Sequence, residues 1–172
     1  MEEPPKRKKI DRSLLIALIA LLINVITVTV YLYQSMIMRE QQYASAWPYL
    51  EWQSVYNQED GYSLFVSNNG VGPAIIKNVE IMFDGQQMDN LKSVYDRILE
   101  TSEYPYLSAR VANRVIPAGD QIRLMQINDP MMSELAYYRL DTADFRFRIC
   151  YESIYGEGWT SSGHEVEVSS CP

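Results

Sequence analysis

One stretch of the chain, from Ser13 to Tyr33, constrains the fold more than any other. Its sequence is SLLIALIALLINVITVTVYLY, twenty-one residues without a charge, a proline or a glycine. At about 1.5 Å of rise per residue, a helix of this length matches the ~30 Å hydrocarbon core of a bilayer. Leucine and isoleucine leave it no polar face wide enough for a half-buried helix of a soluble protein. We therefore expect residues 13–33 to be a transmembrane helix whose partner is the lipid bilayer.

The charges that flank this stretch predict its orientation. Five of the six Lys/Arg residues in the first 39 positions precede it, in a short tail over residues 1–12, and only Arg39 follows closely. Positive charge is retained in the cytoplasm, so we expect a cytoplasmic N-terminus and an extracytoplasmic C-terminal domain at the inner (cell) membrane. A cleaved signal peptide would have a shorter apolar region followed by small residues, whereas bulky residues follow here.

The rest of the chain is divided by its periodicity. Residues 34–46 contain good helix formers and predict a helical stalk, which Pro48 ends. Alternating apolar and polar residues predict strands over 49–56, 62–67, 74–83, 145–151 and 164–168, with a hairpin of 113–116 and 122–127. Helical spacing predicts short helices over 87–99 and 129–138. The expected fold class is mainly β: a single N-terminal transmembrane helix, then an antiparallel immunoglobulin-like β-sandwich over residues 47–172 with one or two inserted short helices.

The charge of the predicted domain limits its partners. Residues 40–172 carry nine basic and nineteen acidic residues, a net charge of −10. An acidic surface is poorly suited to the phosphate backbone, so nucleic acid is excluded as a partner.

Catalytic groups are scarce. The chain has one histidine, His164, and two cysteines. A zinc site needs three or four His or Cys ligands, so these three residues in all make such a site very improbable. The sequence also has no nucleophile-elbow pattern. The acidic pairs Glu59-Asp60 and Asp141/Asp144 are more typical of solvated loops than of calcium sites. We expect no enzyme activity and no cofactor. A third hypothesis is a hydrolase or carbohydrate-active enzyme that uses two carboxylates. It needs two Asp or Glu side chains close together in a cleft, and the sequence does not show which residues these would be.

Cys150 and Cys171 form a candidate disulfide in an exported domain. If the last hairpin turns near Gly156-Glu157, the two cysteines lie apart; if it turns near Thr160-Ser161, they lie opposite each other. Both registers keep the apolar residues of the two strands on one face. The sequence does not decide between the two registers, and it also allows Cys150 and Cys171 to be two separate free thiols.

Two sets of residues are candidates for contacts with other proteins. Asn24 is the polar side chain of the span that needs a hydrogen-bond partner within the membrane. This need favours contact with another helix. Tyrosine is abundant, and Tyr104, Tyr106, Tyr137 and Tyr138 are the candidate partner surface, because exposed tyrosine is favoured where proteins bind each other.

The segments NNGVGPAIIKNV, IPAGD and FRFRICYESIYGEGW together resemble a group of small, membrane-anchored bacterial proteins of unassigned function. The resemblance implies an N-terminal span, a C-terminal β-domain and no particular activity. In that group the segment around CYESIYGEGW tends to carry extra cysteines, whereas this chain has Glu152, Glu157 and Gly158 there.

Taken together, these features predict a non-enzymatic single-pass anchor whose β-domain binds or positions a protein or envelope partner. The alternative is a membrane sensor or effector whose β-domain binds a small ligand and controls self-association of the span through Asn24.

Overall fold

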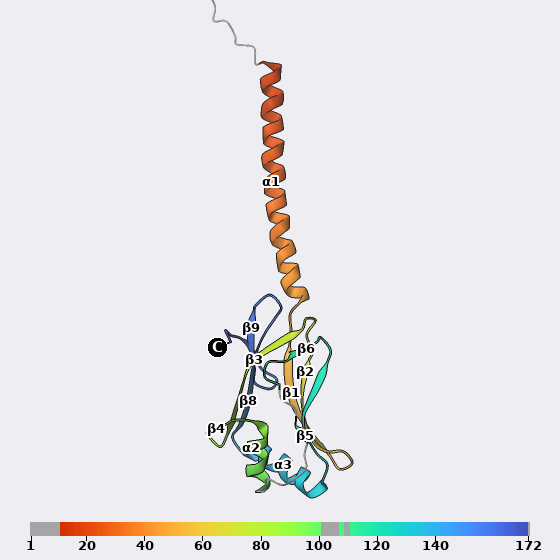
Figure 1. Cartoon of the computed structure of the whole chain (residues 1–172). Coiled ribbons are helices and arrows are strands. Elements are labelled where there is room, and N and C mark those ends of the chain that lie inside the picture. The colour runs from red at the N-terminus through yellow and green to blue at the C-terminus, as the bar shows by residue number, and fades with distance from the viewer. Residues whose placement is uncertain (1–10, 101–106, 109–110, 172) are drawn as a thin grey trace, which may run out of the picture. The chain divides into compact units, whose positions relative to one another are not determined.

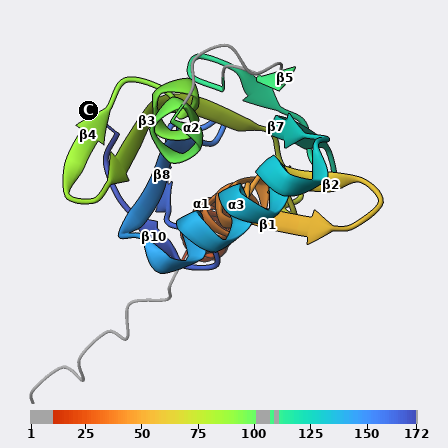
Figure 2. The same ribbon diagram turned by 90° about the horizontal axis from the view of Figure 1, so that it is seen from below.

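The computed structural model describes residues 11–100, 107–108 and 111–171. Contacts divide the chain into two units, Met1–Gln42 and Tyr43–Pro172, which are described separately below. Figure 1 labels most of the helices and strands, and Figure 2 adds β7 and β10.

The described part of the first unit is one helix, α1 (Arg12–Ser45). Asp11 begins it, because the Asp11 carboxylate accepts a hydrogen bond of 3.2 Å from the Ser13 amide. None of its residues is buried, and by length and composition it can cross a membrane. The predicted segments 13–33 and 34–46 therefore lie on one continuous helix, apart from Ala46.

The second unit contains two antiparallel sheets. The first has the strand order β1 (Leu50–Asn57), β2 (Gly61–Asn68), β7 (Gln121–Ile127) and β5 (Leu107–Ser108). The second has the order β10 (Val166–Val168), β9 (Gly158–Ser161), β8 (Phe145–Glu152), β3 (Ala74–Phe83) and β4 (Gln86–Met88), with β6 (Val115–Ile116) also paired to β3.

Both sheets contribute to one hydrophobic core. Leu64 and Leu124 of the first sheet and Ile149 of the second are fully buried members of the same cluster. The Trp52 ring of β1 meets the Phe147 ring of β8 edge-on, with centroids 5.8 Å apart. A shared core of this kind stabilises both layers, because neither sheet can bury its apolar face alone.

Two helices lie across one end of the sheets, as Figure 2 shows. Asn90 caps α2 (Leu91–Leu99) by accepting a 3.0 Å hydrogen bond from the Ser93 amide. Asp129 caps α3 (Pro130–Thr142) in the same way, and Pro130 occupies the first turn, where its missing N–H costs nothing. We call this end of the domain the helix end and the opposite end, where Tyr43 begins the unit, the entry end.

The structure supports the predicted fold class only in part: a long apolar N-terminal helix is followed by antiparallel sheets, but the chain is not mainly β. Helices and strands take about equal shares of the described residues. The single helix α1 has 34 residues and α3 has 13, whereas most of the strands are short.

Two predicted pairings also differ from the structure. Residues 113–116 and 122–127 do not form a hairpin, because β6 pairs with β3 and β7 pairs with β2 and β5. Ile116 is fully buried beside Ala74, so the turn that follows it carries the chain from one sheet to the other. The predicted helix over 87–99 begins only at Leu91, since residues 86–88 form β4.

The C-terminal segment follows neither register considered above. β8 pairs with β9 through a turn at residues 153–157, and β9 then pairs with β10, so β9 separates the two predicted strands. After β10 the Ser169 amide continues the pairing with β9 by donating to the Gly158 carbonyl at 3.0 Å, and the Ser169 hydroxyl lies 2.6 Å from the Thr160 hydroxyl. Thr160 pairs with Cys150 of β8, and the Cα atoms of Cys150 and Cys171 lie 5.6 Å apart, where the two side chains form a disulfide bond.

Candidate functional site

The strand β1 lies at one end of its sheet and, among the residues that the structure describes, carries the longest strand edge with no neighbouring strand. The other edge strands of the two sheets have two or three residues each, whereas β1 has eight. Proteins usually shorten or charge such edges, because unpaired backbone groups attract other strands. The middle of β1, Gln53-Ser54-Val55, is exposed and carries no charge.

The hydrogen-bond pattern shows which backbone groups of β1 face away from β2. The Tyr49 carbonyl accepts from the Asn69 amide at 2.8 Å, on the β2 side. The Leu50 amide instead donates to the Tyr151 hydroxyl at 3.2 Å. Since register with β2 continues without a shift from Leu50 to Asn57, the alternation continues as well. The N–H and C=O groups of Trp52, Ser54 and Tyr56 therefore point to the open side of β1.

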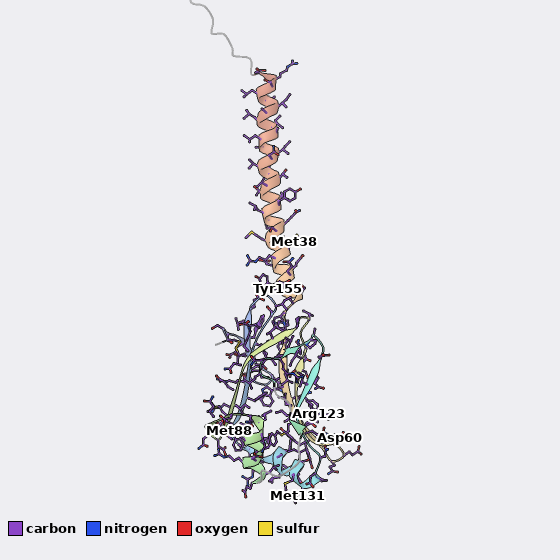
Figure 3. The ribbon with its side chains drawn as sticks, in the orientation of Figure 1. Met38, Asp60, Met88, Arg123, Met131 and Tyr155 are labelled. Atoms are coloured by element: carbon purple, nitrogen blue, oxygen red, sulfur yellow. A yellow bond between two sulfur atoms is a disulfide. The ribbon has the colours of Figure 1, made fainter. Side chains whose placement is uncertain are left out.

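An aromatic cluster lies at the end of this edge. The rings of Tyr56 and Tyr137 are stacked with centroids 5.4 Å apart, and Tyr138 meets Tyr137 edge-on at 5.6 Å. We call Tyr56, Tyr137 and Tyr138 the tyrosine cluster. Tyr138 is 57% exposed and Met131, two turns earlier on the same face of α3, is 70% exposed. Figure 3 shows Met131 at the helix end of the domain.

Acidic residues surround the open edge and the tyrosine cluster. Glu59 and Asp60 are exposed in the turn that follows β1, and Figure 3 shows Asp60 on the outside of the domain. Glu134 and Asp141 are exposed on α3, where Arg139 is the one basic residue. The surface therefore combines a free backbone edge, aromatic rings and negative charge.

The residues predicted as contact sites are distributed over the whole molecule. Tyr137 and Tyr138 join Tyr56, which sequence reasoning did not single out, while Tyr104 and Tyr106 lie outside the described residues. The pairing of Tyr56 with Tyr137 depends on how α3 packs beside β1, and no local pattern indicates it. Asn24 donates its amide N–H to the Ala20 carbonyl of its own helix at 2.9 Å, and its contact with a second helix stays a prediction.

Three tyrosines are the buried titratable groups in the described segments of the domain. Burial raises the pKa of Tyr62 to about 12 and holds the pKa of Tyr95 well above 10. Burial also raises the pKa of Tyr151 to about 12. These hydroxyls stay protonated at neutral pH, so they can donate hydrogen bonds and cannot act as bases.

Histidine and the carboxylates stay near the surface. The His164 side chain is 79% exposed and contacts Glu51, whose other oxygen accepts a 2.8 Å hydrogen bond from Asn69. In the described part of the chain, no Asp or Glu is among the buried residues and no group of three His, Cys, Asp or Glu side chains is placed to hold a metal ion.

Comparison with known proteins gives one match. A family model with the description "Domain of unknown function (DUF8453)" matches residues 12–170, which include α1 and both sheets. Nothing matches among curated proteins or among solved structures. The resemblance noted from the sequence is thus supported in a coarser form, as a family of unassigned function whose match includes an apolar N-terminal helix.

Proposed function

The chain belongs to the family described as Domain of unknown function (DUF8453), and we propose that it is a single-pass membrane anchor that binds an extended segment of a partner protein along β1. The observation that carries this proposal is the eight-residue edge of β1, uncharged at its centre and open on one side. In this view the domain is a two-layer β-sandwich of immunoglobulin-like type that acts as a binding module without catalysis.

The anchor part of the proposal rests on α1. The helix is apolar from Ser13 to Tyr33, and the charges before it favour a cytoplasmic N-terminus. The domain is then extracytoplasmic, where the Cys150–Cys171 disulfide is chemically stable.

The binding mode follows from the backbone of β1. A partner strand that lies beside β1 can exchange hydrogen bonds with Trp52, Ser54 and Tyr56, whose backbone groups face the open side. Such bonds give affinity for an extended chain of almost any sequence, so side-chain contacts must supply specificity. The tyrosine cluster and Met131 offer those contacts at the end of the strand.

The charge around the site specifies the partner further. Glu59, Asp60 and Glu134 favour Lys or Arg in the flanks of the bound segment. We therefore propose an extended apolar segment with basic flanks as the ligand.

The test uses the full-length protein in its own membrane with a photocrosslinking amino acid in place of Val55. Light is expected to give one discrete heterologous adduct. Ser54→Pro removes one outward N–H without touching the β1–β2 hydrogen bonds, and it should abolish the adduct. Ser54→Val keeps that N–H and should preserve it, which makes it the matched control.

Two outcomes contradict the proposal. An adduct that survives Ser54→Pro shows that the partner does not use the strand edge. An adduct composed only of this chain replaces the heterologous partner by a second copy. Circular dichroism of the purified variants shows whether each has kept its sheets.

A further inference from the structure

The core side of β1 reaches solvent at Ser54, in the middle of the edge that the proposed partner uses. Side chains alternate along a strand, so Ser54 shares one face of β1 with Trp52 and Tyr56. The residues opposite Ser54 and Trp52 in β2 are Leu64 and Val66, and both are fully buried. This face of β1 therefore belongs to the core side of the sheet, yet Ser54 itself is exposed.

The exposure of Ser54 differs from that of an ordinary residue on the outer face. Its side chain lies near the hydroxyl of Tyr62, a residue that is 1% exposed. Leu50, on the same face of β1, is fully buried, whereas Gln53 and Val55 on the opposite face are exposed, as outer-face residues should be. Ser54 thus marks a point where, in the described part of the domain, the core side of β1 is left uncovered.

Aromatic rings border Ser54 in both directions along the strand. Trp52 precedes it and Tyr56 follows it by two residues, about 7 Å each way. The Trp52 ring meets the Phe145 ring edge-on with centroids 5.9 Å apart, and the Tyr56 ring is stacked on the Tyr137 ring. All four ring residues are half-buried. Ser54 is thus a small residue between two pairs of large rings, and the apolar surface of those rings is only partly covered.

A strand that pairs with β1 brings a side chain to this point. The N–H and C=O groups of Ser54 face the open side, so an antiparallel partner strand places one residue directly opposite, with Cα atoms about 5.5 Å apart. Directly opposite residues share a face of the sheet, so the side chain of that residue is directed to the core side, between the two pairs of rings. Its two neighbours in the partner strand face outward, beside Gln53 and Val55.

We infer that Ser54 determines which segments β1 accepts: the residue opposite Ser54 carries a large apolar side chain, aromatic by preference, that packs between Trp52 and Tyr56. A large side chain at this point covers apolar ring surface that is now half-exposed, and aromatic rings pack well against one another. The inference rests on the proposed function, and it adds the position within the bound segment at which the side chain is selected.

Two dye-labelled peptides test the inference on the full-length protein in mild detergent. One is Lys-Thr-Val-Thr-Phe-Thr-Val-Thr-Lys, and the other has Ala in place of Phe. Both have basic ends and alternating apolar residues, so they differ only in the side chain meant for the position opposite Ser54. By fluorescence anisotropy, we expect the Phe peptide to bind about tenfold more tightly than the Ala peptide, because its ring is removed from water.

Tryptophan substitutions at two adjacent residues show on which face the ring binds. Ser54→Trp fills the position between the rings and should bring the two affinities to within about twofold of each other. Gln53→Trp is the matched control, since it places the same side chain on the outer face, and it should keep the tenfold preference of the unchanged protein at about the same value. Ser54→Val, the control used above, is little larger than Ser and should keep most of the preference for Phe.

Each other result overturns the inference. Equal affinity of the two peptides for the unchanged protein overturns it and leaves strand binding along β1 in place. A preference for Phe that Ser54→Trp does not reduce, or that Gln53→Trp reduces as much, shows that the ring binds elsewhere. Failure of both peptides to bind contradicts strand binding itself and the inference with it. The two peptides are compared on the unchanged protein, so a variant that circular dichroism shows to be misfolded does not remove the test.

Discussion

Asn68 is the residue whose replacement tests the description of the entry end most directly. Its side chain is fully buried and makes four hydrogen bonds to the backbone. The amide donates to the carbonyls of Gly72 and Ile116 at 2.8 and 2.9 Å, and the Oδ1 atom accepts from Tyr49 and Gly70 at 3.2 and 3.1 Å. One side chain thus joins the start of β1, the loop after β2 and the end of β6.

The expected cost of Asn68→Ala follows from these four bonds. The residues that carry the two carbonyls are buried and those that carry the two amides are half-buried. A buried polar group without its partner costs about 1–3 kcal/mol, while the half-buried amides recover water and cost less. We expect the free energy of unfolding to fall by about 3–5 kcal/mol, a large part of the ~5–15 kcal/mol typical of a domain.

Asn69→Ala is the matched control at the next position. Asn69 is exposed, and its side chain makes a single 2.8 Å hydrogen bond with Glu51. Because an exposed bond of this kind exchanges readily with water, its loss should cost less than about 1 kcal/mol.

Urea unfolding of the full-length protein in mild detergent, followed by tryptophan fluorescence, measures both variants. The reasoning is refuted if Asn68→Ala and Asn69→Ala lose similar, small amounts of stability. A change of m-value in either variant would show instead that the substitution alters the compactness of the folded or unfolded state, or that unfolding is no longer two-state.

Three further results are expected from the same assay. Cys171→Ser opens the disulfide to Cys150, whose sequence separation is 21, and should lower the unfolding free energy by about 3 kcal/mol; an unchanged midpoint would show that the bond does not constrain the unfolded chain. Gly61→Ala and Gly85→Ala both place a side chain at positive φ, but only at Gly61 would the new Cβ meet a neighbour, 2.1 Å from the Ile127 carbonyl oxygen, so the loss should be about 1 kcal/mol at Gly85 and several-fold larger at Gly61; equal losses would contradict the close packing. Because Tyr62 has a pKa of about 12 in the folded protein and 10.0 when unfolded, its contribution is complete below pH 10 and is lost as the pH rises toward 12, which a pH series should show as a fall of stability that Tyr62→Phe makes shallower; a slope identical in both proteins would refute it.

The first part of the chain is the part that the sequence predicts best. Lipid-spanning segments must be apolar and helical over a fixed length, so composition alone indicates the helix that the structure contains. The caps of α3 are equally local, since Asp129 and Pro130 act within the first turn of the helix. The C-terminal end of α3 is not determined by local residues in the same way. The helix continues to Thr142, four residues beyond the predicted end at Tyr138.

Strand faces and pairings are harder, because they depend on distant neighbours. In β3, simple alternation places Ile76 and Ile81 on opposite faces, yet both are buried. The register between β3 and β8 shifts between Ile76 and Asn78, and this bulge moves the following side chains to the other face. No signal in the sequence AIIKNVEIMF indicates an extra residue at that point. The short strand β9 was missed for the same reason: only pairing on both sides makes its four residues a strand.

The candidate surfaces were predicted only in part. The abundance of tyrosine led us to expect a partner surface at Tyr137 and Tyr138; the structure shows Tyr137 half-buried and Tyr138 exposed on α3, and their contact with a partner stays a prediction. The residues of β1 do not indicate that it is an edge strand. An alternating pattern such as Tyr49-Leu50-Glu51-Trp52 occurs both at the edge and in the middle of a sheet. The same holds for Asn68 and Asn69, identical neighbours of which one is buried and one exposed.

The proposed contact along β1 has two physical parts that respond differently to salt. Its backbone hydrogen bonds are short-range and nearly independent of ionic strength, whereas the attraction of basic flanks to Glu59 and Asp60 is screened as salt rises. Raising the ionic strength should therefore weaken the crosslink at Val55 without abolishing it. A crosslink that does not change with salt would mean that the basic flanks contribute nothing, which contradicts the proposed charge of the bound segment.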